Sequence, residues 1–301
     1  MVSRILAFRP ANVVSRLAPR SDACPLSPRD LLGEPRPGQP PLLMVRAPTP
    51  AVARGALVAA KFQKAAIALG LPPGTAPAPW FEAVAQAADE LAAGLPFGLS
   101  AELVLEGEGV TQVEGAVNQA WKLVDTGFTH LALDAVAVAQ AERARVIAEV
   151  AAPAVERGLY VEVVVPIESD GLSGRRAAAL LAELLKRRAP ADAVSVRCRA
   201  VTDPDGARAQ IGALSRLSGA LAGLPVFRRG PLSAAVVKAL GGSSLRACED
   251  GGLAAGRGEA DGSEQQEARA FTAVTEILDA LGAGRSALAV VRELERRLVE
   301  G

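Results

Sequence analysis

The chain has 301 residues, half of them hydrophobic, so it can bury a core of the size found in one large domain. Its 33 basic and 33 acidic residues cancel, which gives no overall attraction to nucleic acid or to a membrane surface. Cys24, Cys198 and Cys248 are too few and too scattered for a disulfide framework or a thiolate zinc site. No apolar run approaches the roughly 20 residues that cross a bilayer. We therefore expect a cytoplasmic protein that binds neither nucleic acid nor a membrane.

The first forty residues differ in composition from the rest. Residues 1–20 contain four arginines and no acid, and residues 21–41 are rich in proline, which disfavours regular structure. The sequence therefore predicts a flexible tail over residues 1–40 and a folded domain over residues 41–301. An arginine-rich, acid-free start is also found in transit peptides and in peptides that dock on a partner.

From residue 41 onward, apolar runs of strand length alternate with segments of helical periodicity, which is typical of βα units around a parallel sheet. The eight runs expected to form strands are 42–46, 65–70, 99–106, 129–134, 159–165, 193–199, 225–228 and 243–248. Eight units in about 260 residues fit a closed barrel better than an open doubly wound sheet. No Gly-x-Gly-x-x-Gly follows the first run. We therefore predict an α/β fold, a (β/α)8 TIM barrel.

Polar residues occupy alternate positions in several of these strands. Because successive side chains point to opposite faces, and the apolar sets should face the helices, the polar sets should point into the barrel. The acids lie on the third to fifth strands and are Glu102, Glu106, Asp134 and Glu162. The arginines lie on the sixth, seventh, eighth and first strands and are Arg197, Arg199, Arg228, Arg246 and Arg46.

This division of charge allows two interpretations. Buried charges are costly unless they are paired, so the acids and arginines could form a network that fills the barrel. Alternatively the arginines bind a phosphorylated sugar or another small anion, because barrels of this type commonly hold phosphate after the seventh and eighth strands and a guanidinium suits phosphate. The anion-binding candidates are Arg197, Arg199, Arg228, Arg229 and Arg246. The glycine-rich segment 249–262 follows at the same end, but its acids favour a surface loop.

The order of segments resembles that of a known family. In the class II fructose- and tagatose-bisphosphate aldolases a helix ending in Gly-Phe-Thr leads into a strand ending in Asp, as in GFTHLALDAVAV (127–138), and a helix and a Val-Glu strand follow, as in 146–165. Residues 224–252 stand where that family has a His-Gly-Gly-Ser-Gly loop, a helix and a phosphate-binding strand. Residues 42–50 and 74–81 are similar to segments of the non-catalytic tagatose subunit. The resemblance covers most of residues 41–300.

The resemblance implies a divalent metal held by three histidines, with an Asp beside the first as proton donor. This chain has one histidine, His130, which opens its strand at the end of the barrel away from the usual active face, where a structural role is expected. In LEGEG (105–109) Glu106 occupies the position of the family's proton-donor Asp, and Gly107 or Glu108 occupies that of the first histidine ligand. Arg228 and Arg229 fall where the family's His-Gly-Gly loop begins. We therefore expect no metal and no cofactor.

Two functions remain open. The first is a catalytically lapsed class II aldolase-like barrel that acts as a structural, regulatory or partner-binding subunit, in a homo-oligomer or with a different partner, with or without an anion pocket. The second is a metal-independent lyase that acts on a sugar phosphate, with Glu106, Asp134 and Glu162 as general acid and base. The missing histidines favour the first.

Overall fold

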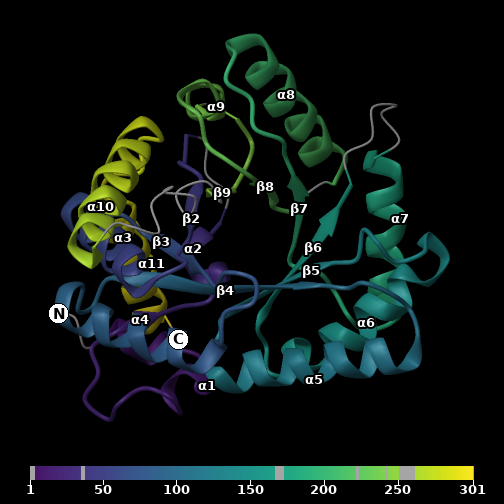
Figure 1. Ribbon diagram of the computed structural model, residues 1–301, viewed down its shortest axis with the longest axis horizontal. Helices are drawn as coiled ribbons and strands as arrows, with labels where there is room; N and C mark the ends of the chain where they lie inside the picture. Colours follow the sequence, from purple (N-terminus) through teal and green to yellow (C-terminus); the bar gives the residue numbers. More distant parts are fainter. Residues whose placement is uncertain are drawn as a thin grey trace.

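A closed barrel of parallel strands forms the centre of the computed structural model, which describes residues 4–34, 38–166, 173–221, 224–241, 243–250 and 262–300 (Figure 1). The barrel strands are β2 (Leu42–Arg46), β3 (Ile67–Gly70), β4 (Pro96–Val104), β5 (His130–Asp134), β6 (Tyr160–Val165), β7 (Ala193–Arg197), β8 (Val226–Arg229) and β9 (Ala247–Asp250). Strand β2 pairs with β3 and β9, and β4 pairs with β5, which closes the ring. The predicted (β/α)8 TIM barrel is confirmed.

Helices alternate with the strands and cover the outside of the ring (Figure 1). They are α3 (Pro50–Gln63), α4 (Pro77–Leu91), α5 (Val110–Thr126), α6 (Gln140–Glu156), α7 (Ser173–Lys186), α8 (Pro204–Ala220), α9 (Ala234–Leu240) and α10 (Ser263–Ala280), with α11 (Ser286–Glu300) at the end. Local sequence sets their starts: Thr49 caps α3 by accepting a hydrogen bond from the Val52 amide, and Pro50 occupies its first position. Within the described ranges, no helix has the length and apolar character of a membrane span.

Helices α3 and α10 pack closely because α3 presents a glycine at their contact. A Cβ atom on Gly55 would lie 2.3 Å from the carbonyl oxygen of Glu267 and 2.8 Å from the Ala270 methyl carbon. Any side chain at this position would therefore push the two helices apart, and the last βα unit depends on this residue to close the outer layer.

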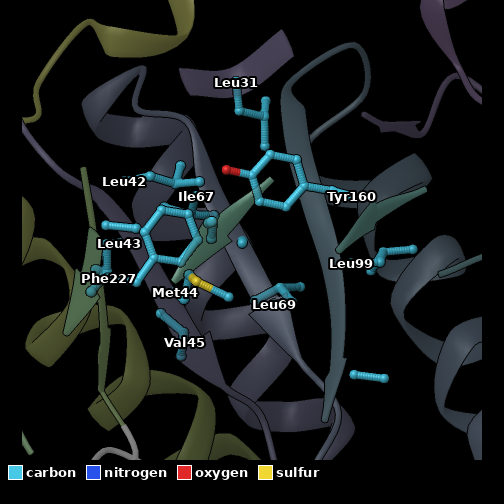
Figure 2. Close-up of a cluster of buried hydrophobic side chains, with 14 of the residues drawn as sticks. Leu31, Leu42, Leu43, Met44, Val45, Ile67, Leu69, Leu99, Tyr160 and Phe227 are labelled. Carbon is cyan, nitrogen blue, oxygen red and sulfur yellow. The ribbon is translucent and has the colours of Figure 1, made fainter. Parts of the chain in front are cut away.

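The N-terminal half of the barrel interior is apolar and aromatic (Figure 2). The rings of Tyr160 and Phe227 stack with centroids 6.2 Å apart, and the ring of His130 meets them edge-on at 5.4 and 6.3 Å. Leu31, which belongs to the N-terminal extension, lies beside Tyr160 in the same cluster (Figure 2). The extension therefore closes this end of the barrel.

The prediction of a flexible tail is wrong for the described residues of the extension, which are 4–34 and 38–40. They form η1 (Ile5–Phe8), α1 (Ala11–Val14), β1 (Cys24–Pro25) and α2 (Pro28–Leu32). Strand β1 adds to β4 in parallel, with Cys24 opposite Pro96. Proline disfavours the interior of a helix, but Pro28 occupies the first position of α2, where its fixed φ favours a helix. Ser27 caps that helix. Residues 1–3 and 35–37 lie outside the described part.

Side chains of the extension also satisfy backbone groups of the barrel units. The Asn12 amide donates to the carbonyl oxygens of Val124 and Phe128 at the end of α5, at 2.8 and 2.9 Å. The Arg29 guanidinium binds both carboxylate oxygens of Asp192, at 2.9 and 2.8 Å. From the barrel side, Arg246 donates to the Leu32 carbonyl oxygen at 2.5 Å, so arginines of both the extension and the barrel hold the extension in place.

We expect Leu31→Ala to lower the free energy of unfolding by roughly 2–4 kcal/mol, because the substitution removes a side chain that is 4% exposed and leaves a cavity at the end of the barrel. Val14→Ala is the control, since Val14 lies in the same extension but is 48% exposed, and it should change the stability by at most about 0.5 kcal/mol. Chemical denaturation of both variants measures this. Equal, small effects would show that the extension does not pack on the barrel.

Candidate functional site

The C-terminal mouth of the barrel, where active sites of this fold usually lie, contains an interlocked group of charged side chains. We call it the mouth network, and it consists of Arg46, Glu102, Asp134, Glu162, Arg197, Arg229 and Glu249. The strands bring these residues to one end because they are parallel, so that their carboxyl ends meet at the same rim. Seven of the eight strands contribute a charge to it, and β3 contributes Gly70 instead.

Arg229 lies at the centre of the mouth network and is 5% exposed. Its Nε donates to Glu162 Oε1 at 2.5 Å and to Ser195 Oγ at 3.1 Å. Its Nη1 donates to the Glu249 carboxylate and lies 3.8 Å from Glu102 Oε2. One guanidinium thus faces carboxylates from β4, β6 and β9.

Two further arginines complete the mouth network above Arg229. Arg46 Nη2 lies 2.6 Å from Glu249 Oε1 and 3.1 Å from Glu102 Oε2. Arg197 donates through Nε to Asp134 Oδ2 and through Nη2 to Glu102 Oε1, both at 2.6 Å. The Arg197 side chain is 49% exposed, whereas those of Glu102 and Asp134 are each 7% exposed. Arg197 therefore covers the two acids from the solvent side.

His130 contacts the lower edge of the mouth network. Its imidazole is fully buried, and Nε2 lies 3.0 Å from Glu162 Oε2. Since the ring also packs against Tyr160 and Phe227, it belongs to the interior of the barrel and not to the mouth. The residue has the structural surroundings expected for the start of a barrel strand.

Burial and ion pairing oppose each other in the mouth network. Burial disfavours the charged form of Glu162, but Arg229 and His130 beside it hold the pKa of this carboxyl well below its usual range. Burial likewise works against the charge of Arg229, but Glu162, Glu249 and Glu102 raise its pKa above the ordinary value. For Glu102 burial prevails and raises the pKa of the carboxyl, although Arg229 and Arg197 offset part of the effect. The Glu162–Arg229 pair is therefore the most firmly ionised part of the network.

The three predicted catalytic acids do not converge on a common open space. Asp134 and Glu162 belong to the mouth network and are 5% and 0% exposed. Glu106 is exposed and lies beyond the end of β4. The strand that we expected over 99–106 ends at Val104, so the alternation that placed Glu106 inside the barrel does not extend to it.

Three of the five predicted anion-binding arginines lie elsewhere than expected. Arg228 points away from the barrel interior and donates to Gln210 Oε1 at 3.0 Å and to the carbonyl oxygens of Gly230 and Pro231. Arg246 lies before β9, at the opposite end of the barrel, and contacts the extension. Arg199 is exposed beyond β7. Arg197 and Arg229 are the two that lie together.

The phase of the short strands explains the positions of Arg228 and Arg246, whereas Arg199 lies outside because β7 ends at Arg197. In β8, Phe227 packs inside the barrel and Arg229 follows it on the same face, so Arg228 must face outward. Strand β9 covers Ala247–Asp250 and not 243–248, which brings Glu249 into the mouth network. The prediction of a surface loop over 249–262 is therefore wrong for Glu249; residues 251–261 lie outside the described residues. An acid two positions after an apolar strand residue, as in ACED, is the signal that could have identified it.

The donors at the mouth do not fit the divalent metal that the resemblance implies. Each carboxylate of the mouth network is bound to at least one arginine, and the imidazole of His130 lies in the lower half of the barrel. Across the described ranges, no three His, Cys, Asp or Glu side chains are grouped so that they could hold a metal ion. We therefore derive no chemistry through a metal at this site.

Two thiols flank Arg228 on the outer face of the sheet: Cys248 is buried and Cys198 is partly buried. Burial raises the pKa of Cys248 to about 12 and that of Cys198 to about 11, and the Arg228 guanidinium offsets only part of this effect. Both cysteines are therefore neutral at physiological pH and lack the thiolate that a nucleophile needs.

Comparison with solved structures identifies the fold. The YdjI aldolase from Escherichia coli K12 superposes with a TM-score of 0.60 at 14% identity, over 82% of this chain and 93% of that one. A probable tagatose 6-phosphate kinase from Sinorhizobium meliloti 1021 gives 0.58 at 14% identity, over 85% and 98%. A candidate fructose-1,6-bisphosphate aldolase from Coccidioides immitis gives 0.54 at 13% identity, over 82% and 93%. No protein-family model and no curated protein matches the sequence. The chain has a (β/α)8 barrel fold similar to that of these proteins; at these identities the likeness concerns the fold alone.

Arg229→Met should lower the free energy of unfolding by about 3–5 kcal/mol, because it leaves Glu162 and Glu249 buried without their shared cation. Arg199→Ala removes an exposed arginine from the same end of the barrel and should change the stability by no more than about 0.5 kcal/mol. Urea denaturation of both variants tests this contrast. A destabilising Arg199→Ala with a neutral Arg229→Met would reverse the assignment of the two residues.

The stabilising effect of Glu162 should depend on pH. Its pKa in the folded protein is lower than in the unfolded chain, where it is about 4.3, so its contribution is complete above that value and declines as the pH falls toward the folded pKa. The difference in unfolding free energy between the wild type and Glu162→Gln should therefore be constant from about pH 6 to 8 and shrink below about pH 4. A difference below about pH 4 that equals the difference at about pH 7 would contradict this prediction. Glu102 is present in both proteins, so its contribution to the pH dependence cancels in this difference.

Proposed function

We propose that this protein is a non-catalytic aldolase-like barrel that acts as a structural, regulatory or partner-binding subunit. The observation that carries the proposal is the filling of the mouth by paired charges. The cavity bounded by Arg46, Gly70, Ser100, Glu102, Arg229 and Glu249 has a volume of about 10 Å³. Small-molecule sites usually offer about 300–1,000 Å³, so a sugar phosphate does not fit without separation of the ion pairs.

Separation of these pairs is energetically costly. A substrate that entered the mouth would have to displace Arg197 or Arg46 from carboxylates that are 7% exposed. Loss of one partner leaves an uncompensated buried charge, which costs about 3–5 kcal/mol. Both carboxylate oxygens of Asp134 already accept hydrogen bonds, from Arg197 and from the Val136 amide, and Glu162 is fully buried and bound to Arg229, so neither acid is free to act as a general base. This arrangement favours a structural use of the acids over a catalytic one.

A partner-binding role has additional support at the same end of the barrel. Three valines from neighbouring segments are exposed there: Val104 by 52%, Val110 by 74% and Val136 by 41%. Exposed apolar side chains that gather at one face are a common feature of interaction surfaces. We propose the cytoplasm as the setting, and either a second copy of the chain or a different protein as the partner.

Cleavage assays on purified full-length protein test the proposal directly. With fructose bisphosphate and tagatose bisphosphate as substrates, and with zinc, cobalt or manganese supplied, we expect no cleavage above the buffer rate. We also expect elemental analysis to find less than one metal per chain. Cleavage that is lost together with about one bound metal on chelation would overturn the proposal. Sedimentation of the same preparation tests self-association.

Thermal shift measurements address the alternative of a metal-independent lyase, which the half-exposed Arg197 at the mouth keeps open. Phosphate and the two sugar bisphosphates should leave the melting temperature unchanged. If they raise it in the parent protein and in Arg199→Ala, but not in Arg197→Ala, the mouth binds anions and the lyase becomes the better assignment.

A further inference from the structure

The mouth network leaves one hydrogen-bonding group of its central arginine unused. Arg229 Nε and Nη1 are bound to carboxylates, but Nη2 is buried and has no hydrogen-bond partner among the described residues. A buried guanidinium N–H group without an acceptor is unfavourable, and such groups are rare in folded proteins. Something that accepts a hydrogen bond is therefore expected beside it.

The same arginine lines a small cavity at the mouth. Arg229 lines it, together with Arg46, Gly70, Ser100, Glu102 and Glu249, and its volume of about 10 Å³ is close to that needed for a single water molecule. The cavity exists because β3 contributes a glycine to this layer, whereas the other seven strands contribute charged side chains. Its position is set by the sequence and not by loose packing.

The chemistry of the lining determines which ligand fits. Arg229 Nη2 requires an acceptor. Each carboxylate oxygen of Glu102 and Glu249 accepts one hydrogen bond from an arginine and has the capacity to accept a second. An anion would be repelled by the two carboxylates, and a cation by Arg46 and Arg229. Water can accept from the arginine and donate to the carboxylates or to the Ser100 hydroxyl.

We propose that this cavity is a binding site for one ordered water molecule, held by Arg229, Ser100 and the carboxylates of Glu102 and Glu249. The water completes the hydrogen bonds of Arg229 and makes the mouth network a polar core that includes solvent. This site does not depend on the proposed function, because a catalytic and a non-catalytic barrel can both hold it.

Gly70→Ala distinguishes a hydrated cavity from a dry one by the sign of its effect. A Cβ atom at this position would lie 3.7 Å from Arg46 Cα and 3.8 Å from the Val45 carbonyl oxygen, so the backbone accommodates a methyl group, which would occupy the cavity. In a hydrated cavity the methyl group displaces the water, leaves Nη2 unpaired and should lower the melting temperature by at least about 2 °C. In a dry cavity it improves packing and restricts the unfolded chain, so the melting temperature should rise.

Gly115→Ala is the control, because Gly115 lies on the exposed face of α5 and a Cβ there meets nothing within 4 Å. It should leave the melting temperature equal or slightly higher. A crystal structure that resolves ordered solvent provides the second measurement and does not depend on the variant. We expect a solvent peak within hydrogen-bond distance of Arg229 Nη2. An empty cavity, an increased stability of Gly70→Ala, or an anomalous peak at this position after a bromide soak would each overturn the proposal.

Discussion

The burial of one arginine at the centre of the barrel mouth determines how the surrounding strands can be arranged. Arg229 is 5% exposed, and a guanidinium in such surroundings is tolerated only where carboxylates surround it. Those carboxylates come from β4, β6 and β9, so that β8 must have all three within reach at once. The closed ring and its observed register satisfy this requirement. The mouth network therefore contributes to the specificity of the barrel, whatever its net effect on stability.

The same requirement explains why the mouth offers so little space. In barrels with an open active site, the layer of side chains at the carboxyl ends of the strands is where substrate is admitted. Here that layer consists of long charged residues that reach across to one another, and β3 alone ends in a glycine within it. The fold that this chain has in common with aldolases is thus compatible with a mouth that is occupied by its own side chains.

Sequence patterns predicted the barrel well but its interior only in part. The alternation of strand-length and helical segments gave the fold class, and the alternation of polar residues in β4, β5 and β6 placed Glu102, Asp134 and Glu162 correctly inside. It failed for β8 and β9, each of which has four residues. A shift of one residue in so short a strand reverses which side chains face inward, and local patterns such as ACED are too short to determine that shift alone. What fixes it is the long-range pairing of Arg229 with Glu162 and Glu249.

The contacts of the N-terminal extension have a consequence for biosynthesis. Its residues are synthesised before their partners: Asn12 precedes Val124 and Phe128, and Arg29 precedes Asp192. Asp30 pairs with Arg297, on the last helix of the chain. Leu26 and Leu31, which are buried in the finished protein, therefore stay exposed through most of translation. Docking of the extension can be completed only when the whole barrel has been synthesised, so a prematurely terminated chain retains an exposed apolar segment that marks it as unfinished.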